Sequence, residues 1–178
     1  PAITVGATGT TTFAENASFT TGNIGTLTSA TTFPVGHIIQ TVFDSSTDDS
    51  ATGTSEFVFF CTGDITIQRA DSDLLIQAVP QLYKSDAGCF VELKLKYKTS
   101  GSRSATVGDY TQIASYPRAS GSAGAAHWDH PPIHYLWTHG QSVGATLNIA
   151  ITGTPGTGPL YSNNGNGRST IVIQEIAG

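Results

Sequence analysis

The sequence predicts an all-β protein: an antiparallel β-sandwich, arranged as a jelly roll, with an extended β-rich N-terminal arm. Three observations predict it. Charged residues make up only 12% of the 178 residues, while Thr, Ser and Gly are abundant, which is typical of strands and turns. Segments with a period of two recur, and no segment shows a capped helical pattern. Turn signals separate these segments roughly every ten to fifteen residues, as in sandwiches and jelly rolls.

The clearest strand is Phe90–Lys98, in which apolar and charged residues alternate. One set is Val91, Leu93, Leu95 and Tyr97, and the other is Glu92, Lys94, Lys96 and Lys98. A period of two places the first set against a core and the second in water. In an oligomer the lysines would repel one another, so we expect this face to point away from a symmetry axis or toward an acidic surface such as the 44–49 loop.

Residues 1–36 form a separate segment, and the sandwich domain is expected over 37–178. The segment holds one charged residue, Glu15, and too few large apolar residues for a core of its own. It should therefore pack against the main domain or a neighbouring copy, and we expect an attachment arm that lies on neighbouring subunits or the capsid. The turn 34–36 ends it. Because the chain starts with Pro-Ala and contains no Met, we interpret it as a complete gene product without its initiator Met; the alternative is a fragment.

The first half of the domain contains four expected strands. His37–Phe43 is the first, and the continuous apolar run Phe57–Cys61 fits a strand buried on both faces or at an interface. Leu74–Tyr83 and Cys89–Lys98 flank a five-residue polar connection that ends in Gly88, which predicts a hairpin. Pro80 predicts an edge or a bulge in the first of these two strands.

The second half supplies the remaining strands of about eight in all. They are expected over residues 107–116, 133–138, 145–152 and 169–176. In 133–138, Ile133, Tyr135 and Trp137 share one side, opposite His134 and Leu136. The repeated Asn-Gly of Asn163–Gly167 is the strongest turn signal.

One cluster carries candidate metal ligands. His127, Asp129, His130 and His134 lie within eight residues, and imidazole and carboxylate groups suit zinc and other transition metals. At a threefold axis, one histidine from each subunit would form a three-histidine site. Against this, Pro131-Pro132 imposes an extended path and no zinc-type spacing is present. The favoured interpretation is histidines that hydrogen-bond within a loop or an interface, and no cofactor is expected.

Nothing in the sequence predicts an enzyme. Gly140–Gly144 matches GxSxG around Ser142, but that motif requires a helix after the serine, and here a strand is expected. We therefore predict a turn between two strands. The carboxylate pairs Asp48/Asp49 and Asp71/Asp73 lie in polar turns, where solvated side chains explain them better than glycosidase chemistry.

Sugar binding remains an open alternative, because aromatic and Asn side chains in jelly-roll loops form such sites. The candidate glycan contacts are Trp128, Tyr161, Asn163 and Asn164. The formal net charge of −5 argues against nucleic acid or an anionic membrane as a partner.

Several segments together resemble a known family. They are Phe33–Gln40 (Phe-Pro-Val-Gly-His-Ile-Ile-Gln), Asp71–Ile76, the Lys-rich alternating strand and the C-terminal Gly165–Gly178. In this order, behind a short Gly/Thr-rich segment, they resemble the short virion-associated structural proteins of tailed bacteriophages, common among marine and cyanobacterial phages. The resemblance implies an exposed particle protein, usually a homotrimer with a β-sandwich body, placed on the head as decoration or in tail fibres.

The resulting expectation is a trimeric capsid decoration or cement protein on the virion exterior, with the major capsid protein as its partner. The short N-terminal segment disfavours a fibre shaft. The alternative is a tail-fibre tip that recognises a host surface glycan. Burial at subunit interfaces is expected from five phenylalanines: Phe13, Phe19, Phe33, Phe57 and Phe59.

Overall fold

The computed structural model describes residues 34–46, 55–84, 90–100, 102–119, 127–156, 160–162 and 167–178. The expected arm strands, Phe13, Phe19 and Phe33 lie outside these residues. The first described residues form the expected turn, in which the His37 N–H donates to the Pro34 carbonyl at 3.0 Å. Gly36 adopts a φ of 82° there, a conformation that favours glycine.

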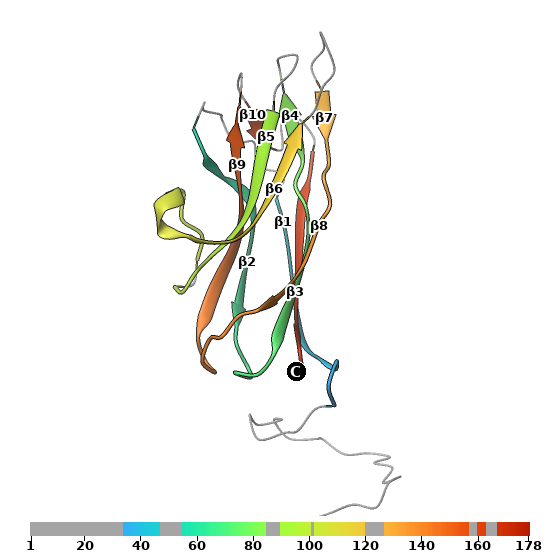
Figure 1. Cartoon of the computed structure of the whole chain (residues 1–178), viewed down its shortest axis with the longest axis vertical. Coiled ribbons are helices and arrows are strands. Elements are labelled where there is room, and N and C mark those ends of the chain that lie inside the picture. The colour runs from blue at the N-terminus through green and yellow to red at the C-terminus, as the bar shows by residue number, and fades with distance from the viewer. Residues whose placement is uncertain are drawn as a thin grey trace, which may run out of the picture. The chain divides into compact units, whose positions relative to one another are not determined.

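Strands make up most of the described body, which Figure 1 shows as an elongated sandwich. Eight strands form its two main sheets: β1 (Ile38–Ser46), β2 (Phe57–Thr66), β3 (Asp73–Val79), β5 (Phe90–Lys98), β6 (Thr111–Ala119), β8 (Ile133–Thr138), β9 (Thr146–Pro155) and β11 (Ser169–Ile176). Three short strands form a separate third sheet: β4 (Leu82–Lys84), β7 (His127–Asp129) and β10 (Leu160–Ser162). One 3-10 turn, η1 (Val107–Asp109), precedes β6. Among the described residues, no helix is long and apolar enough to cross a membrane.

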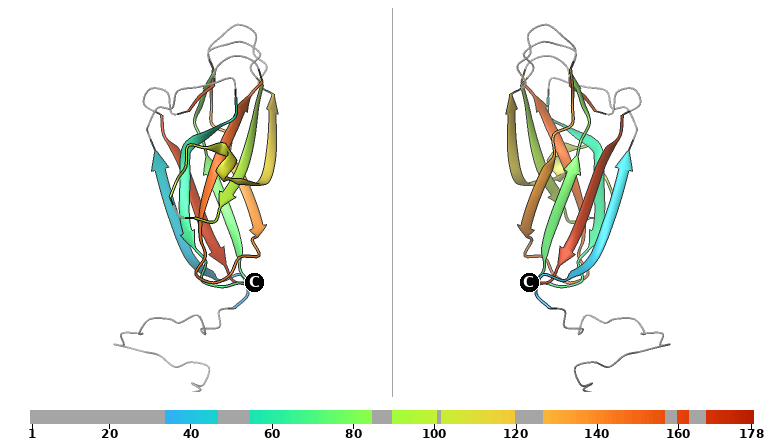
Figure 2. Two further views of the ribbon diagram at one scale, coloured as in Figure 1. Left: turned by 90° about the vertical axis from the view of Figure 1, so that its left-hand side faces the viewer. Right: turned by 90° about the vertical axis from the view of Figure 1, so that its right-hand side faces the viewer.

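The strand pairing is that of a jelly roll. β1 pairs with β11, β2 with β9, β3 with β8 and β5 with β6, all antiparallel. Each pair therefore encloses the next one along the chain, and β5 with β6 is the innermost pair. Successive ribbon pairs alternate between two sheets, ordered β1-β11-β3-β8 and β2-β9-β5-β6. The right-hand view of Figure 2 shows the sheet β1-β11-β3-β8 across its width. This order confirms the predicted fold.

Two prolines separate the short strands from the long ones. β10, β4 and β7 pair in that order, and each lies next in the chain to β11, β3 or β8. Pro80 separates β3 from β4, and Pro131 lies between β7 and β8. Proline lacks the N–H that a sheet ladder requires, so the sheet is interrupted at both places. The sequence predicted an edge or a bulge at Pro80; the structure shows instead a break between β3 and β4, and β3 lies between β11 and β8.

The core lies between the two sheets and is almost entirely aliphatic. Val91, Leu93 and Leu95 of β5 are at most 1% exposed, which confirms the alternation. Opposite them lie Ile171 and Ile173 of β11, and Leu74 and Ile76 of β3. Gly63 of β2 lies close to the facing sheet: an added Cβ would lie 2.8 Å from Ile173 Cδ1, so a side chain there would require Ile173 to shift.

The predicted hairpin of Leu74–Tyr83 with Cys89–Lys98 is wrong. β5 pairs with β6 and β9, while β3 pairs with β11 and β8 in the other sheet. The polar connection after β4 therefore crosses from one sheet to the other. A short loop ending in glycine marks a chain reversal, and a reversal between sheets has the same local composition as one within a sheet.

Candidate functional site

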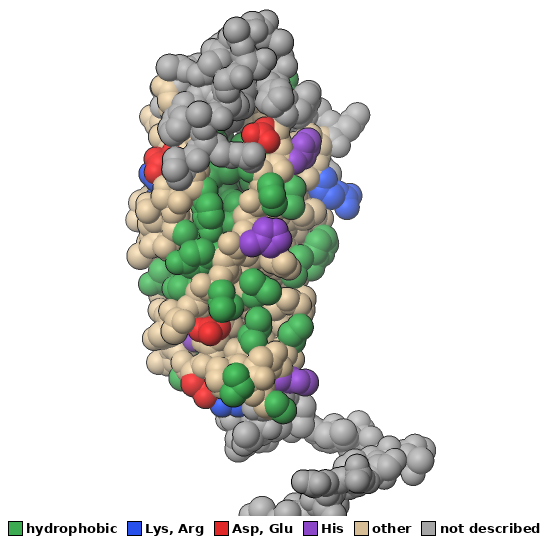
Figure 3. Space-filling model, turned by 45° about the vertical axis from the view of Figure 1, so that its right-hand side comes forward, with side chains coloured by type: hydrophobic (Ala, Val, Ile, Leu, Met, Phe, Trp, Pro, Cys, Tyr) green, Lys and Arg blue, Asp and Glu red, His purple; other side chains and the backbone are tan. Residues whose placement is uncertain are grey.

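The outer side of the sheet β1-β11-β3-β8 presents a broad face to solvent, here called the open face. Its outward residues are Thr41, Phe43 and Ser45 of β1; Thr170, Val172, Gln174 and Ile176 of β11; Asp73, Leu75, Gln77 and Val79 of β3; and His134, Leu136 and Thr138 of β8. Of these residues, Asp73 alone carries a formal charge. Phe43 and Leu136 are 62% and 58% exposed. Figure 3 shows hydrophobic side chains gathered along this side of the body.

Cross-strand register arranges the open face in rows. One row runs Phe43, Val172, Gln77 and His134, and the next runs Thr41, Gln174, Leu75 and Leu136. Two amides bond sideways within these rows: Gln77 Nε2 lies 3.3 Å from His134 Nδ1, and Gln174 Nε2 donates to Thr41 Oγ1 at 3.4 Å. Four of the polar side chains of the open face are therefore paired in the plane of the sheet.

The outer side of the other sheet is partly covered by its own chain. Tyr110, which follows η1, donates to Asn148 Oδ1 at 2.8 Å, and Asn148 Nδ2 donates to Asp64 Oδ1 at 2.5 Å. The Ser102 N–H donates to the second oxygen of Asp64 at 3.0 Å. Val58, Tyr110 and Ala150 form a small apolar cluster beneath this segment. Among the described residues, the sheet β1-β11-β3-β8 is thus the one whose outer face carries no such covering segment.

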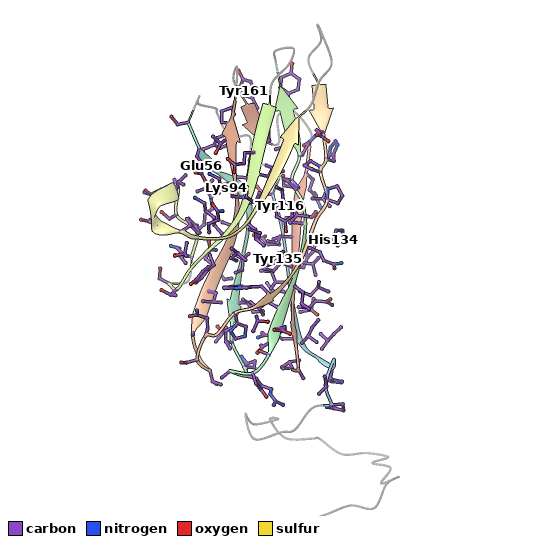
Figure 4. The ribbon with its side chains drawn as sticks, viewed as in Figure 1. Glu56, Lys94, Tyr116, His134, Tyr135 and Tyr161 are labelled. Carbon is purple, nitrogen blue, oxygen red and sulfur yellow. The ribbon has the colours of Figure 1, made fainter. Side chains whose placement is uncertain are left out.

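The lysine side of β5 is not the solvated face that the alternation predicted. Glu56, just before β2, lies between two of the lysines, with Oε1 2.7 Å from Lys96 Nζ and Oε2 3.2 Å from Lys94 Nζ; Figure 4 labels Glu56 and Lys94. Lys96 is only 7% exposed, and Lys98 Nζ lies 5.8 Å from the centre of the Tyr110 ring. An acidic partner of these lysines is Glu56, while Asp48 and Asp49 of the expected 44–49 loop lie outside the described residues.

Charge pairing shifts the pKa values of Glu56 and Lys94. Burial raises the pKa of Glu56, but hydrogen bonds from Lys96, Thr152 and Lys94 together outweigh it, so the pKa lies below its ordinary value. Burial likewise lowers the pKa of Lys94, and its contacts with Glu56 and Glu92 raise it by more. Both shifts favour the charged forms, so the network stabilises the fold as an ion pair.

A second polar cluster lies buried at the end of the sandwich where the chain terminates. Glu175 of β11 is fully buried and accepts the backbone N–H groups of Gln68 and Arg69, at 3.0 and 2.8 Å to Oε1. Gln40 Nε2 donates to Oε2 at 2.5 Å. The carboxylate therefore fastens the turn between β2 and β3 to β1 and β11. A buried carboxylate is tolerated only with such a complete set of donors.

Ser72 and His139 join this cluster, but not as a nucleophile and its base. Ser72 Oγ lies 2.6 Å from Glu175 Oε1 and 2.7 Å from the Arg69 carbonyl. His139 Nδ1 accepts the Gln141 N–H at 2.9 Å, so the ring proton sits on Nε2 and is donated to Ser72 Oγ, 3.1 Å away. Catalysis by a Ser–His pair requires the opposite direction, with the serine donating to Nε2. This cluster ties together three chain segments.

The buried histidine predicts a specific pH dependence. Burial lowers the pKa of His139 below 6.5, while the weaker effects of Glu175 and Asp73 raise it. Since the folded pKa lies below the unfolded one, stability is complete above about pH 6.5 and falls as the pH drops below that value. We expect His139→Gln to lose less stability than the original chain as the pH falls from about 7 to about 5, because the glutamine does not take up a proton. Chemical denaturation at several pH values measures this, and parallel curves for the two proteins contradict it.

The proposed metal ligands are not brought together where the structure describes their side chains. His134 lies on the open face, pointing away from the core (Figure 4), and His130 is exposed beyond β7. Asp129 is half-buried, and the side chain of His127 lies outside the description. Within the described ranges, no group of three His, Cys, Asp or Glu side chains is placed to hold a metal.

The predicted contact residues have mixed positions. Phe59 is fully buried, so its assignment to an interface is corrected: it points inward from β2, where Phe57 meets it edge to face at 4.8 Å between ring centres. Trp137 packs on Tyr97 at 4.6 Å against the core. Tyr161 pairs with Tyr83 at 5.8 Å, near the upper end in Figure 4. The Trp128 side chain, Asn163 and Asn164 lie outside the description.

The interpretation of the GxSxG match as a turn is confirmed. Ser142 is exposed between β8 and β9, and Gly140 and Gly144 adopt φ values of 62° and 84°. The chain continues into β9 rather than a helix.

Glu56, Ser72, His139 and Glu175 were not identified from the sequence. Glu175 alone had a signal, because it shares the inward parity of Ile171 and Ile173 along β11. A charged residue at an inward position requires buried partners. The others come from turns and strand ends, where no periodicity indicates direction.

Comparisons with known proteins give the following. No protein-family model matches the chain, and no curated protein matches it. It is similar to a chain of infectious bursal disease virus, Gx strain, with 12% identity, a TM-score of 0.43, and coverage of 79% of this chain and 33% of that one. For the VP2 subviral particle of that virus, the values are 10%, 0.45, 79% and 34%. Eiger TNF from S. frugiperda is 10% identical, with a TM-score of 0.41 and coverage of 79% and 93%.

This chain spans about a third of the length of the two viral chains. At these scores and identities the likenesses carry no argument about function, and the jelly-roll assignment rests on the strand pairing itself.

Proposed function

We propose that the chain is a non-enzymatic structural protein of a bacteriophage particle, displayed on its exterior as a homotrimeric capsid decoration or cement protein. The contrast between its interior and its surface carries the proposal. The interior is filled with aliphatic side chains, and the buried polar groups Ser72, His139 and Glu175 bond to one another and to a turn. A broad, nearly uncharged sheet face is left to solvent. Such a molecule is suited to assembly.

The phage setting is supported by the sequence resemblance, which implies a β-sandwich body. The jelly-roll order of the two sheets agrees with that implication. In this proposal the major capsid protein is the partner. The alternative is a tail-fibre tip that binds a host glycan through the loops at 117–132 and 153–167.

Copy number on purified particles distinguishes these two placements. Quantitative mass spectrometry against the major capsid protein measures it. Hundreds of copies per head support decoration, and a few dozen or fewer on the tail support the fibre tip. Absence of the protein from purified particles contradicts both placements.

The N-terminal segment is proposed to be the attachment arm. We expect deletion of residues 1–33 to abolish binding to particles that lack the native protein, because it removes the proposed arm. The truncated body should still fold, because it begins with the turn at Pro34 and contains the whole jelly roll. Co-sedimentation with particles measures binding, and thermal melting by circular dichroism measures folding. A truncated chain that binds normally, or one that fails to fold, contradicts the arm.

A further inference from the structure

We propose that copies of this chain associate with one another through the open face, the outward residues of β1, β11, β3 and β8. The partner is a second copy of the same face or its immediate surroundings. The number of copies rests on the proposed homotrimer. The choice of surface rests on the charge, area and hydrogen bonds of the open face.

Charge selects the partner. Any contact between identical surfaces brings identical charges together, so a face rich in one sign repels its own copy. The open face holds one carboxylate, Asp73, which lies at one end in the row between Ile176 and Thr138. The opposite outer face carries Glu56, Lys94 and Lys96 and a covering segment. A copy of this chain is tolerated by the first face and not by the second.

The area is sufficient for a specific contact. Four strands spaced by about 4.8 Å give a width of about 19 Å, and four rows of alternate residues give a length of about 26 Å. The flat area is therefore about 500 Å² per copy, or about 1,000 Å² for two copies, which reaches the lower bound of specific interfaces. Side-chain relief raises this area, and the exposed rings and chains of Phe43 and Leu136 supply that relief.

Two of the amides on the open face already have a partner within the sheet. An amide that loses water without a new partner destabilises a contact, and here Gln77 bonds to His134 and Gln174 to Thr41. The apolar side chains that a contact would cover are Phe43, Val79 and Leu136, which are 62%, 37% and 58% exposed. Apolar burial with prepaired polar groups is typical of interfaces between sheets.

The geometry also distinguishes a copy from a small ligand or an extended peptide. The face belongs to a four-stranded sheet whose outward side chains alternate regularly, and β11 and β3 already have partners on both sides. Main-chain hydrogen bonds to a peptide are therefore available only at the sheet edges. The open face is broad, so the outer surface of a second sheet can cover it.

Leu136→Lys tests the proposal in the full-length protein, with Val143→Lys as the matched control. Both replace an exposed aliphatic side chain with a lysine, at 58% and 52% exposure, but Val143 lies in the β8–β9 turn, outside the open face. Light scattering after size exclusion gives the mass, and circular dichroism shows that each variant is folded. We expect the original chain and Val143→Lys to have the mass of at least two 18.5 kDa protomers, two where a pair of open faces closes the contact and three in the proposed homotrimer. The dissociation constant of the Leu136→Lys oligomer should be at least about 100-fold higher than that of the original chain.

A second substitution, Phe43→Lys on β1, extends the test to the other edge of the sheet and should act in the same direction. An original chain of one protomer mass, or a folded Leu136→Lys protein that keeps the original mass and affinity, overturns the proposal. A dimer that both open-face substitutions dissociate supports this surface and contradicts the proposed homotrimer, so the two ideas fail separately.

Discussion

Glu175→Ala is expected to lower the free energy of unfolding by about 4 kcal/mol. The substitution removes the acceptor of the Gln68 and Arg69 N–H groups, of Ser72 and of Gln40. Because Glu175 is fully buried, water cannot replace the lost contacts without opening the end of the sandwich. Each orphaned donor costs about 1–3 kcal/mol. Urea denaturation at a fixed protein concentration measures the change.

Glu175→Gln is the matched control for this prediction. It keeps one acceptor oxygen and the side-chain volume, so it should cost clearly less than the alanine variant, about 2 kcal/mol. Gln40 donates to one carboxylate oxygen, and the Arg69 N–H to the other, so the amide nitrogen must face a donor. A loss below about 1 kcal/mol for Glu175→Ala contradicts the structural role assigned to this cluster.

Glu56→Ala is expected to cost about 3 kcal/mol, because it leaves two lysines on one strand face without their shared counter-charge. Lys94 and Lys96 are 17% and 9% exposed at their side chains, so water compensates only partly. High salt should recover part of the loss by screening the repulsion between the lysines. Urea denaturation at low and high ionic strength measures both effects.

A double-mutant cycle identifies the cause of this loss. Glu56→Ala combined with Lys96→Met should be more stable than Glu56→Ala alone, since the second change removes the uncompensated buried charge. The Lys96→Met side chain keeps most of the apolar stem in place. If the losses in free energy of unfolding from the two substitutions are additive, Glu56 and Lys96 are not coupled, and Glu56 is not the counter-charge of the lysines.

The strands could be predicted from the sequence because their faces differ. Alternation placed Leu93 and Leu95 inside, and Ile133 on the inner side of β8, without any knowledge of partners. The same alternation did not show which strand lies next to which. The hairpin expected between β3 and β5 is wrong because loop composition encodes a reversal and not the sheet to which the chain returns. Partner choice depends on contacts between segments far apart in the sequence, such as β5 with β9.

The polar sites were harder to predict for a related reason. Lys96 and Lys94 look solvated when only their own strand is considered, and Glu56, 38 residues before Lys94, changes that environment. Ser72 and His139 are 67 residues apart. The GxSxG and histidine patterns were conspicuous in the sequence, yet Ser142 lies in a turn and His134 on the open face. The open face itself follows from pairing four strands and is not visible in any one of them.

Sedimentation equilibrium of the unmodified, full-length chain over a range of concentrations tests the central claim most directly. The claim is that this jelly roll assembles through the open face, on which Asp73 alone carries a formal charge. The account predicts a mass of two or three 18.5 kDa protomers that persists at micromolar concentration, and that Leu136→Lys lowers while Val143→Lys does not. A mass of one protomer at every concentration would contradict it.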